Sequence, residues 1–406
     1  MKWGFPIGLS VTFWTFVGFI RSLTDRYDTK VLAASKDQLR QVAVCLPAHN
    51  EARVIRGTIR RLTRLVHVDQ IYVVSDGSTD HTAYLAAKTR VTVFELKKSL
   101  GKASALVMLF RKYNLLTRYK YLLIVDADTL IDKNYLKYSL PLFENPKIVA
   151  VAAHASSLWP KKFGVVKFLI SSYRSRLYFI LQIMMMYGLT SSLNAQPVIP
   201  GFASLYPTKV LKKLKLNTPG LAIEDFNMAF QVHKKKLGRI IYYPFIRASA
   251  IDPITFEDYI SQVSRWNLGF FQTIKHFKVW PSYFWLFLAV FSIEMILTSI
   301  LVAYSFSFVL VVGGYNFALF MAFFPQQISY YLPDVFLFNV EILIGFIVLD
   351  YIFTVFAAAM IRKPWLLVFG WLFFIMRFLD SMVLLAAIPK GFLTLSSGRW
   401  VSPGRR

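Results

Sequence analysis

The sequence lacks the residues on which several large classes of protein depend. It contains one cysteine, Cys45, which excludes an intramolecular disulfide and any cysteine-rich metal site. It has neither a GxxxxGK(S/T) loop nor a GxGxxG turn, so neither a P-loop nucleotide hydrolase nor a dinucleotide-binding fold is supported. Acidic residues are scarce as well, because 22 Asp and Glu stand against 47 Lys and Arg, for a net charge of +25. This imbalance favours anionic partners.

The basic residues are concentrated in the first part of the chain. Residues 1–280 carry 40 Lys and Arg and 17 Asp and Glu, whereas the remainder carries seven and five. Phospholipid headgroups, a phosphorylated substrate and nucleic acid are the candidate partners, although Lys and Arg also collect on the cytoplasmic side of any membrane protein. We expect no nucleic-acid binding, because the aromatic residues lie mostly in apolar segments and not between the basic ones.

Long apolar segments are abundant. The chain is 56% hydrophobic and its mean hydropathy is +0.47. Residues 283–312 and 335–360 exceed the roughly 20 apolar residues that a bilayer-crossing helix needs. Residues 365–388 are also apolar but contain Arg377 and Asp380, so this segment either crosses the bilayer or is re-entrant.

These segments predict the layout of an integral membrane protein with a cytoplasmic domain, which we expect in the plasma membrane. Residues 1–22 are interpreted as a membrane helix and not as a cleaved signal. The expected parts are an N-terminal membrane helix (1–22), a cytoplasmic domain (38–282), two to three transmembrane helices (283–390) and a basic tail (391–406). Within the cytoplasmic part, the hydrophobic run 163–190 contains Lys167, Arg174 and Arg176, which favour an interfacial or acceptor-facing helix over a spanning one.

The part of the chain after residue 40 alternates short apolar runs with helical patterns. This alternation predicts an α/β fold with a mostly parallel sheet, in which ligands bind at the carboxyl ends of the strands. The expected strands are residues 41–48, 70–76, 91–96, 121–128 and 147–154.

Aspartates follow two of these strands. The first strand end reads Asp76-Gly77-Ser78-Thr79-Asp80, and the second reads Asp126-Ala127-Asp128. Two carboxylates two residues apart can approach one hard divalent cation, Mn²⁺ or Mg²⁺, and leave positions open for phosphate oxygens. The alternative is structural, since Asp-x-Asp is a common pattern and DGSTD also suits a turn with a helix cap.

Three further features suggest chemistry. Lys102 lies at the start of a helical pattern, where a lysine and free backbone amides suit a diphosphate. Glu224 and Asp225 precede an amphipathic helix, either as ordinary acidic residues of a first helical turn or as a carboxylate that takes a proton from a hydroxyl. Residues 262–266 read QVSRW, in which an arginine suits a phosphate and a tryptophan suits a sugar, unless both simply anchor the chain at a membrane surface.

Taken in order, the motifs resemble those of the family-2 inverting glycosyltransferases. The resemblance covers about residues 41–280 and continues into the membrane segments in the manner of the cellulose, chitin, hyaluronan and poly-N-acetylglucosamine synthases. A gating loop of the FxVTxK type is not clear, and Phe392-Leu393-Thr394 is a partial match. The motifs that carry the resemblance are PAHNE (47–51), SDGSTD (75–80), GK (101–102), DAD (126–128), IED (223–225) and QVSRW (262–266).

The resemblance implies a glycosyltransferase domain of the GT-A type, fused to transmembrane helices, and a role for each motif residue. Asp128 would bind the metal, and Asp225, beside Glu224, would be the general base. The residues implied to bind nucleotide, diphosphate or acceptor are Pro47, Ala48, Asn50, Glu51, Asp76, Lys102, Asp126, Gln262, Arg265 and Trp266.

The expected activity is sugar transfer from a UDP-sugar, with a divalent metal, to the non-reducing end of a growing β-linked polysaccharide, coupled to secretion through the membrane helices. The alternative is a non-processive enzyme that adds one sugar to a lipid or glycolipid, because QxxRW also occurs in transferases of that kind.

Overall fold

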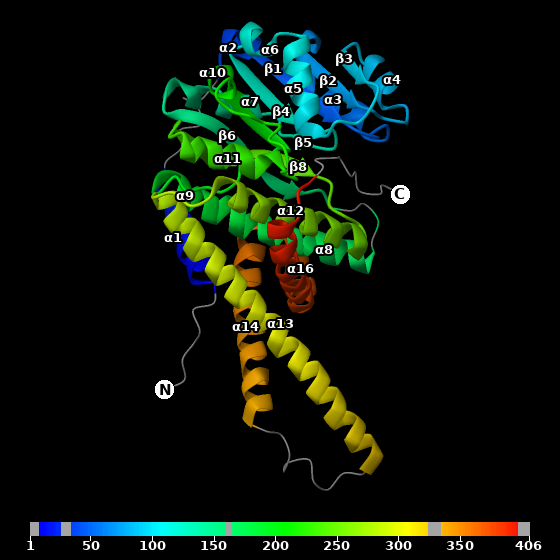
Figure 1. Cartoon of the computed structure of the whole chain (residues 1–406), viewed down its shortest axis with the longest axis vertical. Coiled ribbons are helices and arrows are strands. Elements are labelled where there is room, and N and C mark those ends of the chain that lie inside the picture. Colours follow the sequence, from blue (N-terminus) through cyan, green and yellow to red (C-terminus); the bar gives the residue numbers. More distant parts are fainter. Residues whose placement is uncertain (1–7, 26–33, 160–161, 163, 324–333, 397–406) are drawn as a thin grey trace.

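The computed structural model describes residues 8–25, 34–159, 162, 164–323 and 334–396. The catalytic part forms an eight-stranded sheet in the order β3-β2-β1-β4-β7-β6-β8-β5. Helices cover both faces of this sheet, and long helices extend away from it (Figure 1). The tail predicted at 391–406 lies outside the described residues from 397 onward.

All five predicted strands are present. β1 pairs in parallel with β2 and β4, and β2 pairs in parallel with β3. The side chains of β1, β2 and β4 are buried throughout, as expected for strands covered on both faces, whereas those of the edge strand β3 are mostly part-exposed. The bounds are β1 Val42–Ala48, β2 Ile71–Asp76, β3 Thr92–Leu96, β4 Tyr121–Val125 and β6 Ile148–Ser157.

Three strands were not predicted: β5 (Leu130–Ile131), β7 (Ala203–Pro207) and β8 (Arg239–Ala250). β7 lies in the middle of the sheet and is followed directly by the short helix α10 (Thr208–Leu211). β7 runs antiparallel to both β4 and β6 and makes the sheet mixed. Five residues beside Pro and Gly are too short for periodicity to identify as a strand.

The sheet separates two apolar cores because alternate residues of a strand point to opposite faces. In β1, Ala43 and Cys45 belong to one core, whereas Val42 and Val44 belong to the other. The helices on the first face are α5 (Lys102–Lys112), α6 (Leu115–Arg118), α10 and α11 (Glu224–Lys234). Those on the second are α3 (Ile55–Leu62), α4 (Thr82–Ala87) and α7 (Tyr135–Ser139). Short elements complete the domain: α2 (Lys36–Arg40), η1 (Val68–Gln70) and η2 (Pro141–Glu144).

A layer of helices lies between the sheet and the long helices (Figure 1). It consists of α8 (Val165–Leu177), the π-helical segment η3 (Tyr178–Met185), α9 (Met186–Ser191) and α12 (Phe256–Phe277). Residues 169–176 of α8 are all buried, and α8 contacts β6, α12 and α15. The layer runs across the direction of the long helices. That residues 163–190 lie at a membrane surface stays a prediction.

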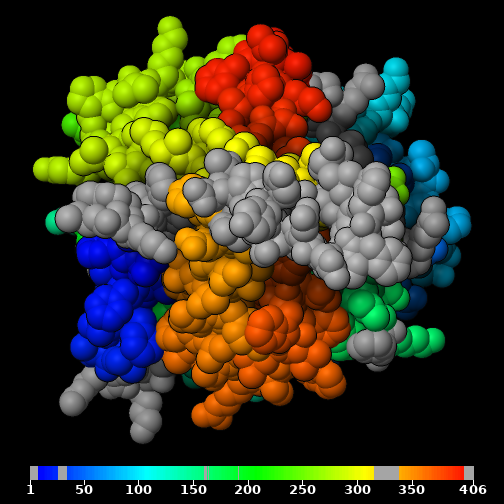
Figure 2. Space-filling view, turned by 90° about the horizontal axis from the view of Figure 1, so that it is seen from below, coloured from blue at the N-terminus to red at the C-terminus, as the bar shows by residue number. Residues whose placement is uncertain are grey.

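Within the part of the chain that the structure describes, two helices are long and apolar enough to cross a membrane, over Tyr283–Gly314 and Phe338–Ile361. They belong to α13 (Tyr283–Phe323) and α14 (Asp334–Ile361). The N-terminal helix α1 (Leu9–Thr24) is shorter and packs on η3, α9 and α13. From the end at which the long helices project, the surfaces of α1 (blue) and α14 (orange) lie side by side (Figure 2). The rings of Phe19 of α1 and Phe356 of α14 are in contact, with their centres 5.4 Å apart.

The segment predicted either to cross or to turn back forms a short helix, α15 (Trp365–Gly370), followed by α16 (Phe373–Leu393). Just before α15, the Lys363 ammonium lies over the Trp159 ring of the catalytic part. Just after α16, the Ser396 N–H donates to Gly220 O at 3.1 Å. Both ends of this α15–α16 hairpin therefore contact the domain that contains the sheet.

Candidate active site

The loops that follow β1 and β2 are bound to each other. The His49 ring donates from Nδ1 to Asp76 O at 2.6 Å, and Asn50 Oδ1 accepts from the Thr79 N–H at 2.8 Å. Asn50 adopts the left-handed region, with φ of 56°. Pro47 and Ala48, the last residues of β1, are paired with β2. The PAHNE and SDGSTD motifs therefore form one edge at the carboxyl ends of adjacent parallel strands.

Asp80 and Glu51 in these loops make structural hydrogen bonds. The Asp80 carboxylate accepts from the N–H groups of Ala52 and Thr82, at 3.1 and 2.9 Å, and so orders the turn before α4. Glu51 is buried, and its N–H donates to the Thr82 hydroxyl at 2.7 Å. The predicted nucleotide contacts of Asn50 and Glu51 stay predictions.

Asp76 fastens the loop that leads to Lys102. Its carboxylate is fully buried and accepts from Leu100 N–H at 2.7 Å, Gly101 N–H at 2.9 Å and the Ser99 hydroxyl at 2.8 Å. Gly101, with φ of 85°, then begins α5. In this arrangement both oxygens of Asp76 orient the backbone, and its predicted contact with a nucleotide stays a prediction.

Lys102 joins two of the predicted acidic groups. Its ammonium lies 2.8 Å from Asp126 Oδ1 and 2.7 Å from Glu224 Oε1. Burial opposes the charge of Lys102, but the surrounding carboxylates raise its pKa well above the ordinary value. Burial also opposes the charge of Glu224, yet the Lys102 charge and hydrogen bond lower the pKa of this carboxyl. Lys102 and Glu224 therefore form a charged pair.

The pKa of Asp225 shifts in the opposite direction from that of Glu224. Burial and then the charge of Glu224 raise the pKa of Asp225 to about 7, against the opposing effects of Lys102 and of the Gly201 N–H. Oδ1 of Asp225 is buried and accepts no hydrogen bond from the described residues. A carboxylate with a pKa near neutrality and a free oxygen is suited to general-base catalysis.

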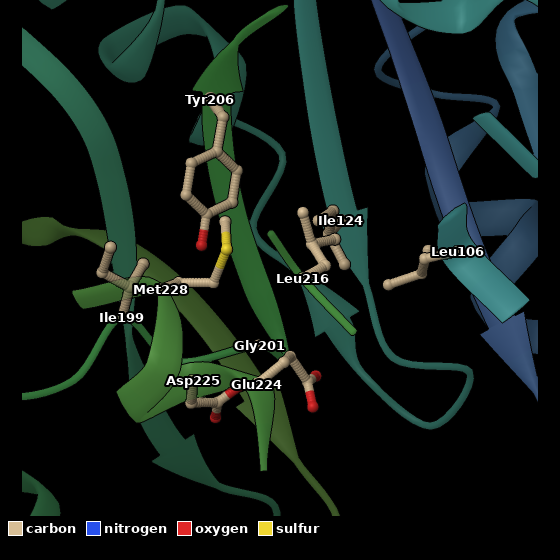
Figure 3. A pocket seen from close by; sticks show the side chains of 9 residues that line it. All are labelled: Leu106, Ile124, Ile199, Gly201, Tyr206, Leu216, Glu224, Asp225 and Met228. Atoms are coloured by element: carbon tan, nitrogen blue, oxygen red, sulfur yellow. The ribbon is translucent and has the colours of Figure 1, made fainter. Parts of the chain in front are cut away.

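A small pocket behind the acids explains why Asp225 is poorly solvated. Apolar side chains, including Ile124, Leu216 and Met228, line it, and the two carboxylates lie at its edge beside Gly201 (Figure 3). A Cβ at Gly201 would overlap Asp225 Oδ1 and would lie 2.7 Å from Lys102 Nζ. The absence of a side chain at Gly201 therefore leaves the space in which the charged groups meet.

Asp126 and Asp128 follow β4, as predicted. Burial raises the pKa of Asp126 to about 6, with Lys102 opposing and the charge of Asp128 adding to the rise. No group of three or more His, Cys, Asp or Glu side chains within the described part of the chain forms a metal cage. The oxygen donors present fit a partial shell for a hard divalent ion, which takes its remaining ligands from water and phosphate. Asp128 and Asp126 are the residues that would hold such an ion.

The QVSRW motif lies on α12 and interacts with two parts of the molecule, the carboxylate cluster and α8. The Arg265 charge acts on Glu224, so this residue approaches the carboxylate cluster. Gln262 instead accepts a hydrogen bond from Arg174 of α8, and the Arg174 guanidinium lies 4.7 Å from the centre of the Trp266 ring. The motif therefore bridges the carboxylates and the helical layer.

Sequence reasoning assigned no role to Arg174, nor to Tyr178, which begins the π-helical segment η3. The available signal was the presence of cations inside a hydrophobic run, which identified an unusual helix but not its contact with Gln262, 88 positions away. The partial match at Phe392–Thr394 lies beside α12, where Gln272 Nε2 donates to Thr394 O at 3.2 Å.

The chain is similar in sequence to two curated relatives. Over 271 residues the chain is 25% identical to the poly-β-1,6-N-acetyl-D-glucosamine synthase of Staphylococcus aureus (strain COL), covering 63% of this chain and 63% of that protein. It is 24% identical over 258 residues to the synthase of the same name from Staphylococcus epidermidis, covering 62% and 60%. The match thus spans less than two thirds of the length of these curated relatives.

By structure, the chain is similar to the mannosyltransferase PcManGT from Pyrobaculum calidifontis in complex with GDP-Man and Mn²⁺. The TM-score is 0.56 at 17% identity, over 95% of both chains, and it shows a shared GT-A fold. Residues 40–269, more than half of the chain, match the family described as glycosyltransferase-like family 2. The chain belongs to glycosyltransferase family 2 and is a glycosyltransferase of the GT-A fold.

Proposed function

We propose that the protein is a membrane-embedded inverting glycosyltransferase that transfers a sugar from a UDP-sugar to the non-reducing end of a growing β-linked polysaccharide. The observation that carries the proposal is the meeting of Lys102 with Asp126 and Glu224 beside Asp225. A cation and an acceptor-side base thus lie within one cluster at the end of β4, where substrates bind in sheets of this kind.

The reaction is a single displacement. The acceptor hydroxyl oxygen bonds to the anomeric carbon of the donor, the bond from that carbon to the diphosphate oxygen breaks, and UDP leaves. Asp225 receives the proton of the hydroxyl, which a base with a pKa of about 7 can accept at neutral pH. Lys102 and Arg265 stabilise the charge that develops on the departing diphosphate.

Asp128 and Asp126 are the residues that would hold a divalent cation, Mn²⁺ or Mg²⁺. Such an ion would supply charge neutralisation for the leaving diphosphate. The residues of this chain retain separate tasks: Asp76 fixes the loop in front of Lys102, and Gly201 leaves room for the acids. Pro47, Ala48, Asn50 and Glu51 border the expected nucleotide site.

N-acetylglucosamine is the first donor sugar to test. The support is the name of the curated relatives, poly-β-1,6-N-acetyl-D-glucosamine synthase, at 25% identity. The contacts that separate one hexose from another are few, so identity at this level makes UDP-N-acetylglucosamine a leading candidate and keeps UDP-glucose and UDP-glucuronate in the panel.

The membrane placement follows from the apolar helices. α13 and α14 cross the bilayer, and the α15–α16 hairpin enters and returns on the catalytic side. This arrangement keeps Arg362, Lys363 and the end of α16 in the cytoplasm together with the catalytic domain. The polymer leaves past the helical layer that contains QVSRW, in the plasma membrane.

One experiment tests the proposal. The purified full chain, in detergent or nanodiscs, is supplied with Mn²⁺ or Mg²⁺ and a panel of UDP-sugars, UDP release is measured, and the products are sized. We expect release with one donor and a ladder or polymer of that sugar. A single sugar on a lipid or glycolipid establishes the non-processive alternative, and tight UDP binding without release from any donor overturns both enzymatic proposals.

A further inference from the structure

Arg174 is a deeply buried cation to which the proposed chemistry assigns no task. Only 2% of the residue is exposed. Its two terminal nitrogens point to different partners: Nη2 donates to Gln262 Oε1, and Nη1 donates to the Tyr178 hydroxyl at 3.2 Å. Its Nε lies 3.9 Å from Asp252 Oδ1. Burying a guanidinium among rings is costly unless each bond is well placed, so this position calls for an explanation.

The same guanidinium also stacks on aromatic rings of α12. It lies 4.7 Å from the ring centre of Trp266 and 5.5 Å from that of Tyr259. Gln262 and Trp266 are four positions apart and therefore on one face of the helix. One side chain of α8 thus holds the first and the last residue of QVSRW, while Trp266 remains half-buried and partly open to a ligand.

On its other side Arg174 reaches toward the metal-binding residues. Tyr178 accepts its hydrogen bond, and the charge of Asp128 acts on the Tyr178 hydroxyl. Tyr178 begins the eight-residue π-helical segment η3, and π-helical turns are rare and frequent at functional sites. The contacts of Arg174 therefore extend from QVSRW toward the end of β4.

We propose that Arg174 is a positioning residue for the acceptor: it orients the Gln262 amide and the Trp266 ring that receive the acceptor sugar. The inference rests on the proposed function. Only arginine can do this, because a planar fork donates in two directions and stacks at the same time, whereas lysine is a point charge. Preorganised rings lower the ordering cost of binding a flexible oligosaccharide.

The test compares Arg174→Lys and Arg174→Gln with Arg176→Lys in the full chain. Arg176 is a matched control, because it is on the same helix, is 1% exposed and pairs with Asp350 of α14 instead of QVSRW. The substrates are the donor with the highest UDP release in the panel and a β-linked tetramer of the same sugar. We expect the acceptor KM to rise about tenfold in Arg174→Lys, and acceptor kcat/KM to fall about 100-fold in Arg174→Gln.

Both Arg174 variants should keep three values within about twofold of the unmodified protein: the donor KM, the Kd for UDP and the rate of acceptor-independent donor hydrolysis. In Arg176→Lys, these values and the acceptor KM and kcat/KM should all stay within about twofold. A double-mutant cycle adds a readout that a merely structural role would not move. If Arg174 acts through Gln262, then adding Gln262→Ala to Arg174→Gln should lower the acceptor kcat/KM little further. If Arg174→Gln fails to fold, Arg174→Lys and Tyr178→Phe carry the same comparison.

Equal loss for donor and acceptor, an unchanged acceptor KM in Arg174→Lys, or additive effects in the cycle would each overturn the positioning role. These results are distinct from a failure of the proposed function, in which the unmodified protein transfers no sugar to the tetramer from any donor in the panel.

Discussion

At the scale of single residues, the site depends on how adjacent acids are placed. Glu224 and Asp225 are neighbours in the first turn of α11, yet one is paired with Lys102 and the other faces an apolar pocket. The pair lowers the pKa of Glu224, whereas burial raises the pKa of Asp225 to about 7. Two acids with different environments can take different tasks, and Asp225 is the one suited to remove a proton.

Asp225→Asn should abolish transfer while leaving the fold intact, because an amide of the same shape cannot accept the proton. General-base removal lowers rates by about 10²- to 10⁴-fold. UDP release under saturating donor is the measurement, and the exposed Asp69→Asn is the control. The base assignment fails if the purified Asp225→Asn protein transfers sugar at the parental rate.

Gly201→Ala should inactivate the enzyme through crowding alone. The added methyl would overlap Asp225 and lie 2.8 Å from Glu224 Oε1 and 2.7 Å from Lys102 Nζ, so the charged groups must separate. We expect a loss of at least about 100-fold in kcat, since small displacements of catalytic groups are costly. Gly57→Ala on α3, where a methyl meets nothing within 4 Å, should leave the rate unchanged. Equal rates in the two variants would contradict this geometry.

At the scale of elements, α11 connects the acids to the long helices. Its first turn contains Glu224 and Asp225, and its last turn contains His233. The His233 ring donates from Nε2 to Gln196 O at 2.8 Å and stacks on Phe284 of α13 at 4.3 Å. Burial lowers the pKa of His233 to about 4, so this histidine is neutral in the folded protein at neutral pH.

The free energy of unfolding should therefore decrease as the pH falls from about 6.5 to about 4. In this window the unfolded state binds a proton at this histidine and the folded state does not, and the contribution reaches roughly 3 kcal/mol at the lower end. His233→Gln, which keeps a donor for Gln196, should make the melting temperature fall less steeply with pH. The exposed His67→Gln is the control, and an identical pH slope in His233→Gln and the unmodified protein would contradict the prediction.

At the scale of the whole molecule, the helical layer fixes the sheet to the long helices. Tyr173 of α8 and Tyr259 of α12 both donate to Asp380 of α16, at 2.8 and 2.7 Å. Arg176 of α8 and Arg377 of α16 both bond to Asp350 of α14. These polar contacts lie within an apolar part of the chain, where a charge is retained only if it is paired. They bind the α15–α16 hairpin to the same layer that contains QVSRW.

The sidedness of this hairpin can be measured by cysteine labelling. The natural Cys45 is fully buried, and burial raises the pKa of its thiol, so it leaves a silent background. Single cysteines at Lys363 and at the exposed Leu395 should react with a membrane-impermeant maleimide only from the side on which Lys36→Cys of the catalytic domain reacts. Gln327→Cys, at a position between α13 and α14 in the chain, should react only from the other side. Labelling of Leu395→Cys together with Gln327→Cys would show that α16 crosses the membrane.

The sequence by itself determined the elements with a strong local signal. Continuous apolar strands, the order of PAHNE, DGSTD, DAD, IED and QVSRW, and the two long apolar helices are all legible along the chain, and the five predicted strands are present. Their signals are local because buried strands and long helices require particular residues at each position. The short antiparallel strand β7 has no such signal, since its place between β4 and β6 is a property of the sheet.

Only the tertiary structure decided how the site is arranged. It placed Lys102 between Asp126 and Glu224, turned Asp76 toward the loop 99–101, and brought Arg174 to Gln262. Each of these contacts joins residues far apart in the chain, and the state of a carboxylate depends on burial and neighbouring charges that no local pattern records. For the same reason, the contacts that join both ends of the α15–α16 hairpin to the catalytic domain could be read only from the tertiary structure.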